Sequence, residues 1–240
     1  MRMNDYAGKE FLATVRAEDF AHAGEEEAID LVFKDIPAKS DRKILDAGCG
    51  RGGTADYVHR HGWGEVIGID IEAQSIERAK EKYPACQFHA CDMCDVGHSF
   101  GGMFDLIYLL NAFYAVPDKQ KAIKSLRASA KPGALLCLFD YVTYDAEAPP
   151  LEEILAQQPS TSEEFDTLLY DAKWHVESNT NLDQKYVQWY RSLLNKIDGA
   201  AVKSTYPKEM IEQVRHKYTT LLNALEDGTM GGLLIVARAQ

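Results

Sequence analysis

Short apolar runs alternate with amphipathic stretches through much of the chain before residue 141. Each run is bounded by polar residues, glycine or proline, and each stretch repeats its apolar residues every three or four positions, as an α-helix does. The expected strands lie at 43–45, 66–69, 86–90, 104–108 and 134–140, and the expected helices at 55–61, 73–83 and 118–130. Strands that alternate with helices in this way predict an α/β domain built on a parallel sheet.

The two ends of the chain follow a different pattern. We expect helices at 25–36, 163–172, 183–197 and 207–227, a strand at 174–182 and an apolar last strand at 232–237. The whole chain, 1–240, is expected to form a single domain. Its parts are an N-terminal arm at 1–23, a cofactor-binding core at 24–145 and 207–240, and a cap over the substrate region at 146–206.

A glycine-rich turn follows the first expected strand. Asp46 ends that strand, and Gly48, Gly50, Gly52 and Gly53 follow it within KILDAGCGRGGT. Such a turn uses positive φ angles and leaves bare backbone and helix N-terminal amides for a nucleotide-like ligand. The glycines fit both the dinucleotide pattern G-x-G-x-x-G and the looser G-x-G-x-G of methyltransferases. A carboxylate at Asp46 would repel a pyrophosphate but attract the ammonium and sulfonium groups of S-adenosylmethionine (AdoMet), which favours the second pattern.

Acidic residues also follow the next two strands. Asp70 lies 22 residues beyond Gly48, at the end of the second strand, where a carboxylate can accept hydrogen bonds from two ribose hydroxyls. A dehydrogenase would use this acid equally, so Asp70 predicts nucleotide binding without choosing the nucleotide. Asp92 and Met93 come directly after the third strand and Cys91.

The order of these motifs resembles the class I AdoMet-dependent methyltransferases, whose first motif is a strand ending in an acid followed by G-x-G-x-G. The resemblance implies a Rossmann-like fold with a seven-stranded, mostly parallel sheet, a reversed last strand and a helical cap insertion. It also implies AdoMet as cofactor and S-adenosylhomocysteine (AdoHcy) as product, with Asp92 accepting a hydrogen bond from the adenine amino group and Met93 lying against adenine. The expected cofactor residues are Asp46, Gly48, Cys49, Gly50, Asp70, Ile71, Asp92, Met93 and Asn111.

The methyl acceptor is expected near Asn111 and Tyr141, which follow the fourth and fifth strands. Tyr141 is predicted to be a polar contact or weak base, and Asn111 to orient the nucleophile. Displacement at a sulfonium needs alignment and exclusion of water more than acid–base groups. Aromatic residues of the cap, such as Trp174, Tyr186 and Tyr190, suit an amine that becomes a cation. We therefore expect an amine nitrogen as acceptor, with a hydroxyl or carboxyl oxygen as the alternative.

Within the class, the run 19–24, the Asp140–Tyr141 pair and the C-terminal helices look like phosphoethanolamine N-methyltransferases and related small-molecule methyltransferases. Those enzymes carry an acid and a His after the fourth strand, where this chain has Asn111 and Ala115. This departure disfavours a phosphobase substrate. In the same enzymes a helix start just upstream of the glycine turn often reaches the methionine end of AdoMet, which makes His22 and Gly24 candidate contacts, with surface capping as the alternative.

The composition of the chain limits the classes of molecule that it is expected to bind. The formal net charge is -11 and no cluster of Lys or Arg is present, which argues against nucleic acid. The sequence lacks both a long apolar run and the apolar region of a signal peptide, so we expect no membrane partner and a cytoplasmic location. The five cysteines, an odd number, are typical of free thiols in a reducing compartment. Cys91 and Cys94 form C-x-x-C near His89, but no second pair completes a site, so no metal is expected.

Two other functions share these features. A non-catalytic AdoMet-binding or partner-binding module would keep the fold, because a fold does not fix a function. An NAD-dependent dehydrogenase would share the glycine turn and Asp70. Binding without turnover would identify the first, and preferential binding of NAD the second. The sequence leaves the oligomeric state open.

Overall fold

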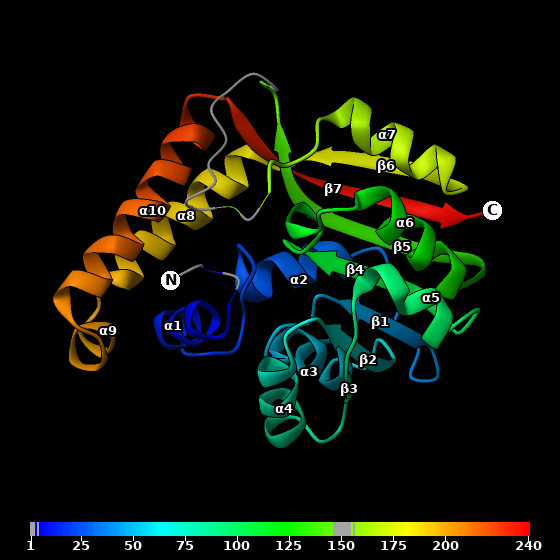
Figure 1. The fold of residues 1–240 in the computed structure, drawn as a ribbon, viewed down its shortest axis with the longest axis horizontal. Coiled ribbons are helices and arrows are strands. Elements are labelled where there is room, and N and C mark those ends of the chain that lie inside the picture. Colours follow the sequence, from blue (N-terminus) through cyan, green and yellow to red (C-terminus); the bar gives the residue numbers. More distant parts are fainter. Residues whose placement is uncertain (1–2, 4, 146–154, 156) are drawn as a thin grey trace.

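The computed structural model describes residues 3, 5–145, 155 and 157–240. Its centre is a seven-stranded sheet with the order β3-β2-β1-β4-β5-β7-β6 (Figure 1). The strands are β1 Lys43–Ala47, β2 Glu65–Asp70, β3 Gln87–Ala90, β4 Phe104–Leu110, β5 Ala130–Thr143, β6 Trp174–Asn181 and β7 Met230–Ala239. Pairing is parallel from β3 to β5, whereas β7 runs antiparallel to both β5 and β6. The predicted α/β class and the reversed last strand are confirmed.

Both faces of the sheet are buried. Successive residues of β1 and β4 alternate between two core layers: Ile44 and Leu106 belong to one layer, and Leu45 and Ile107 to the other. All four side chains are fully buried. A strand covered on both faces needs apolar residues at successive positions, which explains why these strands are apolar runs and not alternating patterns.

Helices form a layer on each side of the sheet. The layer that contains Ile44 is completed by α2 Glu25–Phe33, α3 Gly53–Arg60 and α4 Ala73–Lys82. The layer that contains Leu45 is completed by α5 Val96–Ser99, α6 Lys119–Ser129 and α7 Ser162–Asp171. Two 3-10 turns, η1 Met93–Asp95 and η2 Phe113–Ala115, follow β3 and β4 at the edge where parallel strands end.

Three further helices form the cap: α8 Asp183–Ile197, α9 Ala200–Thr205 and α10 Lys208–Glu226. In Figure 1, α8 and α10 lie side by side as a hairpin that extends beyond the sheet. Its base rests directly on the backbone of β7, because a Cβ at Gly232 would overlap the ring of Tyr186. The amide of Gly232 also donates to Asp183 Oδ1 at 3.1 Å.

The division into core and cap differs from the expected one. Helix α7 and strand β6, both inside the expected cap 146–206, belong to the sheet and its helix layer, and α10, placed in the core, packs on α8. Composition gives little sign that β6 joins the sheet, because β6 is an edge strand whose residues beyond Val176 are exposed and polar. Residues 146–154 and 156 of the expected cap lie outside the described residues.

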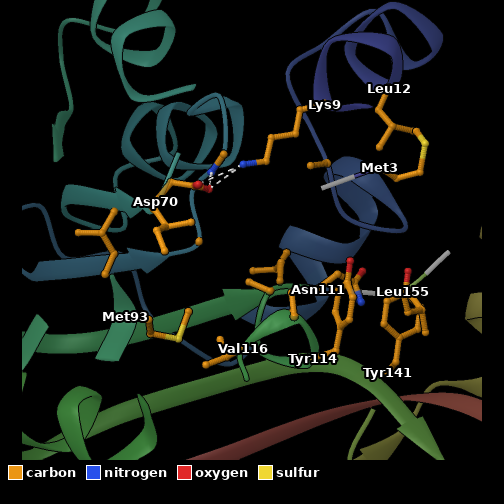
Figure 2. A pocket seen from close by; sticks show the side chains of 18 of the residues that line it. Met3, Lys9, Leu12, Asp70, Met93, Asn111, Tyr114, Val116, Tyr141 and Leu155 are labelled. Atoms are coloured by element: carbon orange, nitrogen blue, oxygen red, sulfur yellow. Dashed lines mark hydrogen bonds and ion pairs between the residues drawn. The ribbon is translucent and has the colours of Figure 1, made fainter. Parts of the chain in front are cut away.

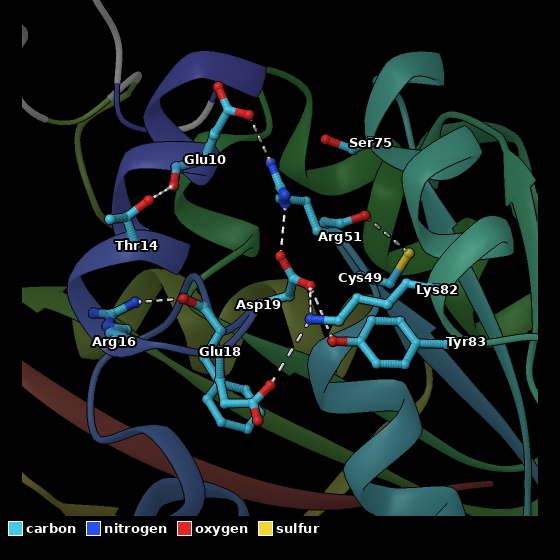
Figure 3. Close-up of polar contacts among 12 residues, drawn as sticks. Glu10, Thr14, Arg16, Glu18, Asp19, Cys49, Arg51, Ser75, Lys82 and Tyr83 are labelled. Atoms are coloured by element: carbon cyan, nitrogen blue, oxygen red, sulfur yellow. Dashed lines mark hydrogen bonds and ion pairs between the residues drawn. The ribbon is translucent and has the colours of Figure 1, made fainter. Parts of the chain in front are cut away.

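The N-terminal arm packs on the glycine turn: Lys9 of α1 (Tyr6–Arg16) lies beside Gly50, and the backbone of Asp19 lies beside Gly53. The buried carboxylate of Asp19 accepts hydrogen bonds from Arg51 Nε at 2.7 Å, Lys82 Nζ at 2.6 Å and the Tyr83 hydroxyl at 3.0 Å (Figure 3). Burial opposes ionisation of Asp19, but the hydrogen bonds from Lys82 and Arg51 outweigh it and hold the pKa of Asp19 below its ordinary value. Because Arg51 lies in the turn after β1 and Lys82 ends α4, Asp19 fixes the arm to the half of the sheet that contains β1, β2 and β3.

Candidate functional site

A cavity of about 240 Å³ lies at the carboxyl ends of the parallel strands (Figure 2). Its wall unites residues that follow four different strands with residues of α1 and of the cap. One end is formed by Gly48, Gly50, Asp70, Ile71, Asp92 and Met93, and the other by Leu12, Tyr114, Tyr141, Leu155, Tyr190, Tyr218 and Leu221. Asn111 also lines the cavity. We call these the nucleotide end and the acceptor end.

The glycine turn adopts the backbone conformation expected of it. Gly48, Gly50 and Gly52 have φ angles of 87°, 52° and 87°, all in the left-handed region. A Cβ at Gly48 would lie 2.5 Å from the Cβ of Ala112, so the turn and the loop after β4 meet where only hydrogen fits. Gly52 has a packing role, because a Cβ there would meet Phe88 at 2.8 Å. Of these three glycines, Gly48 and Gly50 line the cavity.

Asp70 presents a fully hydrogen-bonded carboxylate to the nucleotide end. Its Oδ2 accepts from the Gly50 amide at 2.9 Å, and its Oδ1 accepts from the Glu72 amide at 2.9 Å. Lys9 of α1 donates to both oxygens, at 3.0 and 3.1 Å. Sequence reasoning missed Lys9, because a lysine next to the apolar residues of a short helix has no local pattern that distinguishes it from a surface residue.

Asp46 and Cys49 do not lie on the cavity wall. Burial raises the pKa of Asp46 to about 7; the hydroxyl of Tyr108 lowers it and repulsion from Asp70 raises it. Neither Asp46 Oδ2 nor the Tyr108 hydroxyl has a partner of hydrogen-bonding geometry among the described residues. Asp46 is thus buried away from the cavity wall, so the direct contact with AdoMet that was expected of it is not seen in this arrangement. Burial also raises the pKa of the Cys49 thiol.

The loop after β3 supplies the far wall of the nucleotide end. The Asp92 carboxylate accepts from the Cys94 amide at 2.8 Å and so caps η1, which holds the side chain at the cavity. Met93 is buried beside it. Ile71 is a large apolar side chain that is 74% exposed although it lines the same cavity. An apolar surface left open at this point can be covered by a flat ring.

Asn111, in the loop after β4, forms hydrogen bonds with both the arm and the cap. Its Oδ1 accepts from the Ala23 amide at 2.9 Å, and its Nδ2 donates to the Tyr186 hydroxyl at 2.9 Å. Its φ angle of 50° is uncommon for a residue other than glycine and turns the chain at the end of β4. The amide group that was expected to orient a nucleophile is therefore already engaged by the arm and the cap, with one acceptor lone pair remaining.

The acceptor end is dominated by phenols. The hydroxyls of Tyr141 and Tyr190 form a close hydrogen bond, and Tyr190 stacks on Tyr218 with ring centroids 5.8 Å apart. Burial raises the pKa of Tyr141 well above its ordinary value and that of Tyr190 to about 12. A phenolate at Tyr141 is thus strongly disfavoured, so the base role expected for it is not supported, whereas a hydrogen-bonding role is retained.

A buried carboxylate lies directly behind these phenols. Asp140 accepts from the amides of Tyr141 at 2.8 Å and Tyr114 at 3.0 Å. Burial raises the pKa of Asp140 to about 7, although these backbone hydrogen bonds lower it. Asp140 positions two of the four tyrosines and adds negative potential behind the acceptor end.

The other residues considered from the sequence lie elsewhere. His22 is held between the Ala23 carbonyl and the Thr54 hydroxyl, each 3.0 Å from a ring nitrogen, and burial lowers its pKa to about 3. It is neutral and is not a wall residue. Gly24 begins α2 beneath Trp189. Trp174 packs in the helix layer on the opposite side of the sheet.

Cys91 and Cys94 are free thiols, as are the other three cysteines. Over the described part of the chain, no cluster of three or more His, Cys, Asp or Glu side chains is arranged to hold a metal ion. In the same residues, none of the helices combines the length and apolar character needed to cross a membrane.

The strand order and the reversed β7 are those expected of the class I methyltransferase fold, and the glycine turn after β1 and the acids after β2 and β3 lie where that fold was expected to place them. Residues 44–133 match the family described as "Methyltransferase domain". Over this range, from β1 into β5, and in its sheet with the reversed β7, the chain is similar to the AdoMet-dependent methyltransferases of class I.

Relatives differ in their substrates. Ajmaline N-methyltransferase from Rauvolfia serpentina is 30% identical over 131 residues, 52% of this chain and 44% of that protein. The 2-methyl-6-phytyl-1,4-hydroquinone methyltransferase from Synechocystis sp. is 32% identical over 111 residues, 45% of this chain and 35% of that protein. The chain thus spans less than half the length of these curated relatives.

A solved structure matches nearly the whole chain. Phosphoethanolamine N-methyltransferase 2 from Haemonchus contortus, in complex with phosphomonomethylethanolamine and S-adenosylhomocysteine, aligns with a TM-score of 0.85 at 16% identity. The alignment covers 97% of this chain and 57% of that one. At this identity the likeness describes the fold alone.

Proposed function

We propose that this protein binds AdoMet and transfers its methyl group to a small-molecule acceptor, an amine nitrogen. The observation that carries the proposal is the continuity of the cavity: one space joins the glycine turn, Asp70 and Asp92 to a wall of buried tyrosines. Donor and acceptor sites that share one cavity allow alignment of the two reactants, and the bound reactants would displace water from it, which meets the two requirements of sulfonium displacement.

At the nucleotide end, the cofactor would be held by residues with distinct tasks. Asp70 would accept the ribose hydroxyls, and Asp92 the adenine amino group. Met93 and Ile71 offer apolar surfaces to the adenine ring, and Gly48 leaves room for the methionine part to lie against backbone. The unpaired Oδ2 of Asp46 beneath the turn favours a cofactor that carries positive charge. Bound AdoMet supplies an activated methyl group.

At the acceptor end, the aromatic wall favours an amine. Tyr114, Tyr141, Tyr190 and Tyr218 bring π-systems and hydroxyls to one space, and the charge of Asp140 lies behind them. An amine that gains a methyl group becomes a cation, which aromatic faces stabilise by about 0.5–2 kcal/mol each. A neutral amine needs no base to attack. A hydroxyl acceptor would need one, and the raised pKa of Tyr141 makes its phenolate a poor candidate.

The experiment is a mass-spectrometric screen of amines, amino acids, phenols and carboxylic acids with AdoMet. Formation of AdoHcy together with an amine one methyl heavier is the expected result. Turnover of hydroxyl or carboxyl acceptors alone would contradict the amine assignment, and AdoMet binding without any turnover would identify a non-catalytic binding module.

Cofactor binding is tested separately by calorimetry with AdoHcy and NAD. Asp70→Ala removes the acceptor of two hydrogen bonds to a charged group, worth about 1.5–3 kcal/mol each, so AdoHcy should bind at least tenfold more weakly. Asp35→Ala, which removes an acid whose side chain is 86% exposed, is the matched control and should bind normally. Preferential binding of NAD would overturn the proposal.

A further inference from the structure

Lys9 occupies the part of the cavity that the ribose of a nucleoside would need. Its ammonium lies on the Asp70 carboxylate, with both side chains about nine-tenths buried, at 10% and 8% exposure. A carboxylate has about four acceptor positions, two on each oxygen. The amides of Gly50 and Glu72 take one position on each oxygen, and Lys9 takes the second on each. Asp70 therefore has no position left for a ribose hydroxyl while Lys9 is bound.

The stem of Lys9 competes for the same space. Its Cδ and Cε lie 3.7 and 3.8 Å from the point where a Cβ would stand on Gly50, so they cover the bare backbone of the glycine turn. Figure 2 shows the side chain reaching from α1 across the cavity to Asp70. A nucleoside that uses both Gly50 and Asp70 must displace the ammonium and part of the stem.

A second acid lies within reach of the displaced ammonium. Glu72 Oε2 is 3.5 Å from Lys9 Nζ, already within ion-pair distance. The Glu72 carboxylate accepts from the Tyr6 amide at 2.8 Å and the Ser75 hydroxyl at 2.7 Å, one on each oxygen, which leaves further acceptor positions. A small movement would exchange one carboxylate partner for the other, so Lys9 keeps a counter-charge throughout.

The helix that carries Lys9 is fixed by other contacts. The Tyr6 amide is held by Glu72, and the guanidinium of Arg51 lies 5.3 Å over the Tyr6 ring. Arg51 also pairs with Asp19, farther along the arm. These contacts do not involve Asp70, so the side chain of Lys9 can move while α1 stays in place.

We propose that Lys9 is a positioning residue of the cofactor site that exchanges partners: it holds Asp70 in the ligand-free protein and transfers to Glu72 when ribose hydroxyls take its two positions on Asp70. The inference rests on the proposed function, because it takes the nucleotide end as the site of an adenosyl group. Lys9 lowers cofactor affinity by competition, and Glu72 restores part of that affinity by accepting the lysine.

The test is a calorimetric titration with AdoHcy, which lacks the sulfonium charge. Lys9→Met keeps the length of the stem and removes the competitor, so AdoHcy should bind roughly tenfold more tightly. Glu72→Gln weakens the second partner and leaves Lys9 on Asp70, so AdoHcy should bind several-fold more weakly. The double variant should match Lys9→Met alone, because the Gln side chain can still accept from the Tyr6 amide or the Ser75 hydroxyl and the lost charge reaches the cofactor only through Lys9. Lys82→Met, which breaks an arm contact to Asp19 and leaves Asp70 intact, is the matched control and should not tighten binding.

A ligand without ribose hydroxyls distinguishes the exchange of Lys9 between Asp70 and Glu72 from a general effect of the substitutions on the structure. Adenosine should gain affinity in Lys9→Met, whereas 2′,3′-dideoxyadenosine, which lacks both hydroxyls, should not gain it. Thermal unfolding of each variant establishes that it is folded. Weaker AdoHcy binding in Lys9→Met, or equal effects of Glu72→Gln with and without Lys9, would overturn the exchange. Failure of the wild-type protein to bind AdoHcy at all would instead overturn the proposed function.

Discussion

Substitution of Gly48 by alanine tests the contact between the glycine turn and the loop after β4. The residue has a φ of 87°, and its missing side chain faces Ala112, the neighbour of Asn111. An added Cβ would lie 2.5 Å from the Cβ of Ala112, a distance that requires one backbone to move. Because both partners belong to the cavity wall, the movement would reach the site itself.

The cost has two parts that a control can separate. The left-handed conformation costs a residue other than glycine about 1–2 kcal/mol. Overpacking against a neighbour that cannot rotate away adds about 1–3 kcal/mol. Gly48→Ala should therefore lower the free energy of unfolding by about 2–5 kcal/mol. Gly62 has a similar φ of 75°, and no atom lies within 4 Å of the point where its Cβ would stand, so Gly62→Ala should lose only the conformational part, about 1–2 kcal/mol.

Urea denaturation followed by circular dichroism measures both variants, with equal m-values required for the comparison. Titration with AdoHcy then reports the site: Gly48→Ala should bind more weakly because Ala112 and Asn111 are displaced, and Gly62→Ala should bind like the wild type. Equal losses of stability in the two variants would refute the steric reasoning. Unchanged AdoHcy binding in a folded Gly48→Ala protein would refute the link from the turn to the site.

Three further outcomes follow from the buried charges and phenols. Asp19→Asn leaves Lys82 and an arginine without their carboxylate and should lower the free energy of unfolding by about 3 kcal/mol at pH 7. Because the pKa of Asp19 lies below its ordinary value in the folded protein, the difference should persist through neutral and mildly acidic pH in urea titrations and shrink only as the folded wild-type acid takes up its proton; a difference that already vanishes at pH 5 would contradict this. Burial raises the pKa of Asp46 and Asp140 to about 7, so between pH 4 and 7 the folded state binds more protons than the unfolded state. The free energy of unfolding should therefore fall as the pH rises from about 4 to 7, by at most about 1.4 kcal/mol per pH unit and group, and then level off. A flat profile between pH 5 and 7 would contradict this. Tyr141→Phe removes one hydroxyl of a hydrogen-bonded pair but no base, so kcat for the amine found in the screen should fall less than tenfold and keep its pH profile.

The sheet could be predicted because its signals are local. A strand buried on both faces must be apolar at successive positions, and an acid or glycine at its end is visible in the next few residues, as at Asp46 and Asp70. Strand β6 was expected at 174–182, but its place in the sheet was not, since an edge strand is mostly polar and composition does not record what an element packs against. Strand β5 extends to Thr143, beyond the expected end, because β7 pairs with it as far as Met230.

The site was predicted only where a residue follows directly from a strand. Asn111 and Tyr141 line the cavity, as expected for positions at the carboxyl edge, but their detailed roles depend on partners far away in the chain. Asn111 is engaged by Ala23 and Tyr186, and Tyr141 by Tyr190. No local sequence pattern predicts such hydrogen bonds, because they depend on how the arm and the cap fold back over the sheet. The ion pair of Lys9 with Asp70 is likewise a contact between distant residues that the sequence does not predict.

The two glycines at the start of β7 decide which parts of the molecule move together. At Gly231 and Gly232 the cap helix α8 rests on strand backbone, with Asp183 and Tyr186 filling the space that side chains would take. Interlocking of this kind makes the cap and the sheet a single mechanical unit, whose amide protons should exchange with solvent only when the whole unit unfolds. The arm belongs to the same unit, because Phe11, Leu12 and Val15 of α1 are buried in the core that the cap helices share, so the amide protons of α1 should be protected together with it.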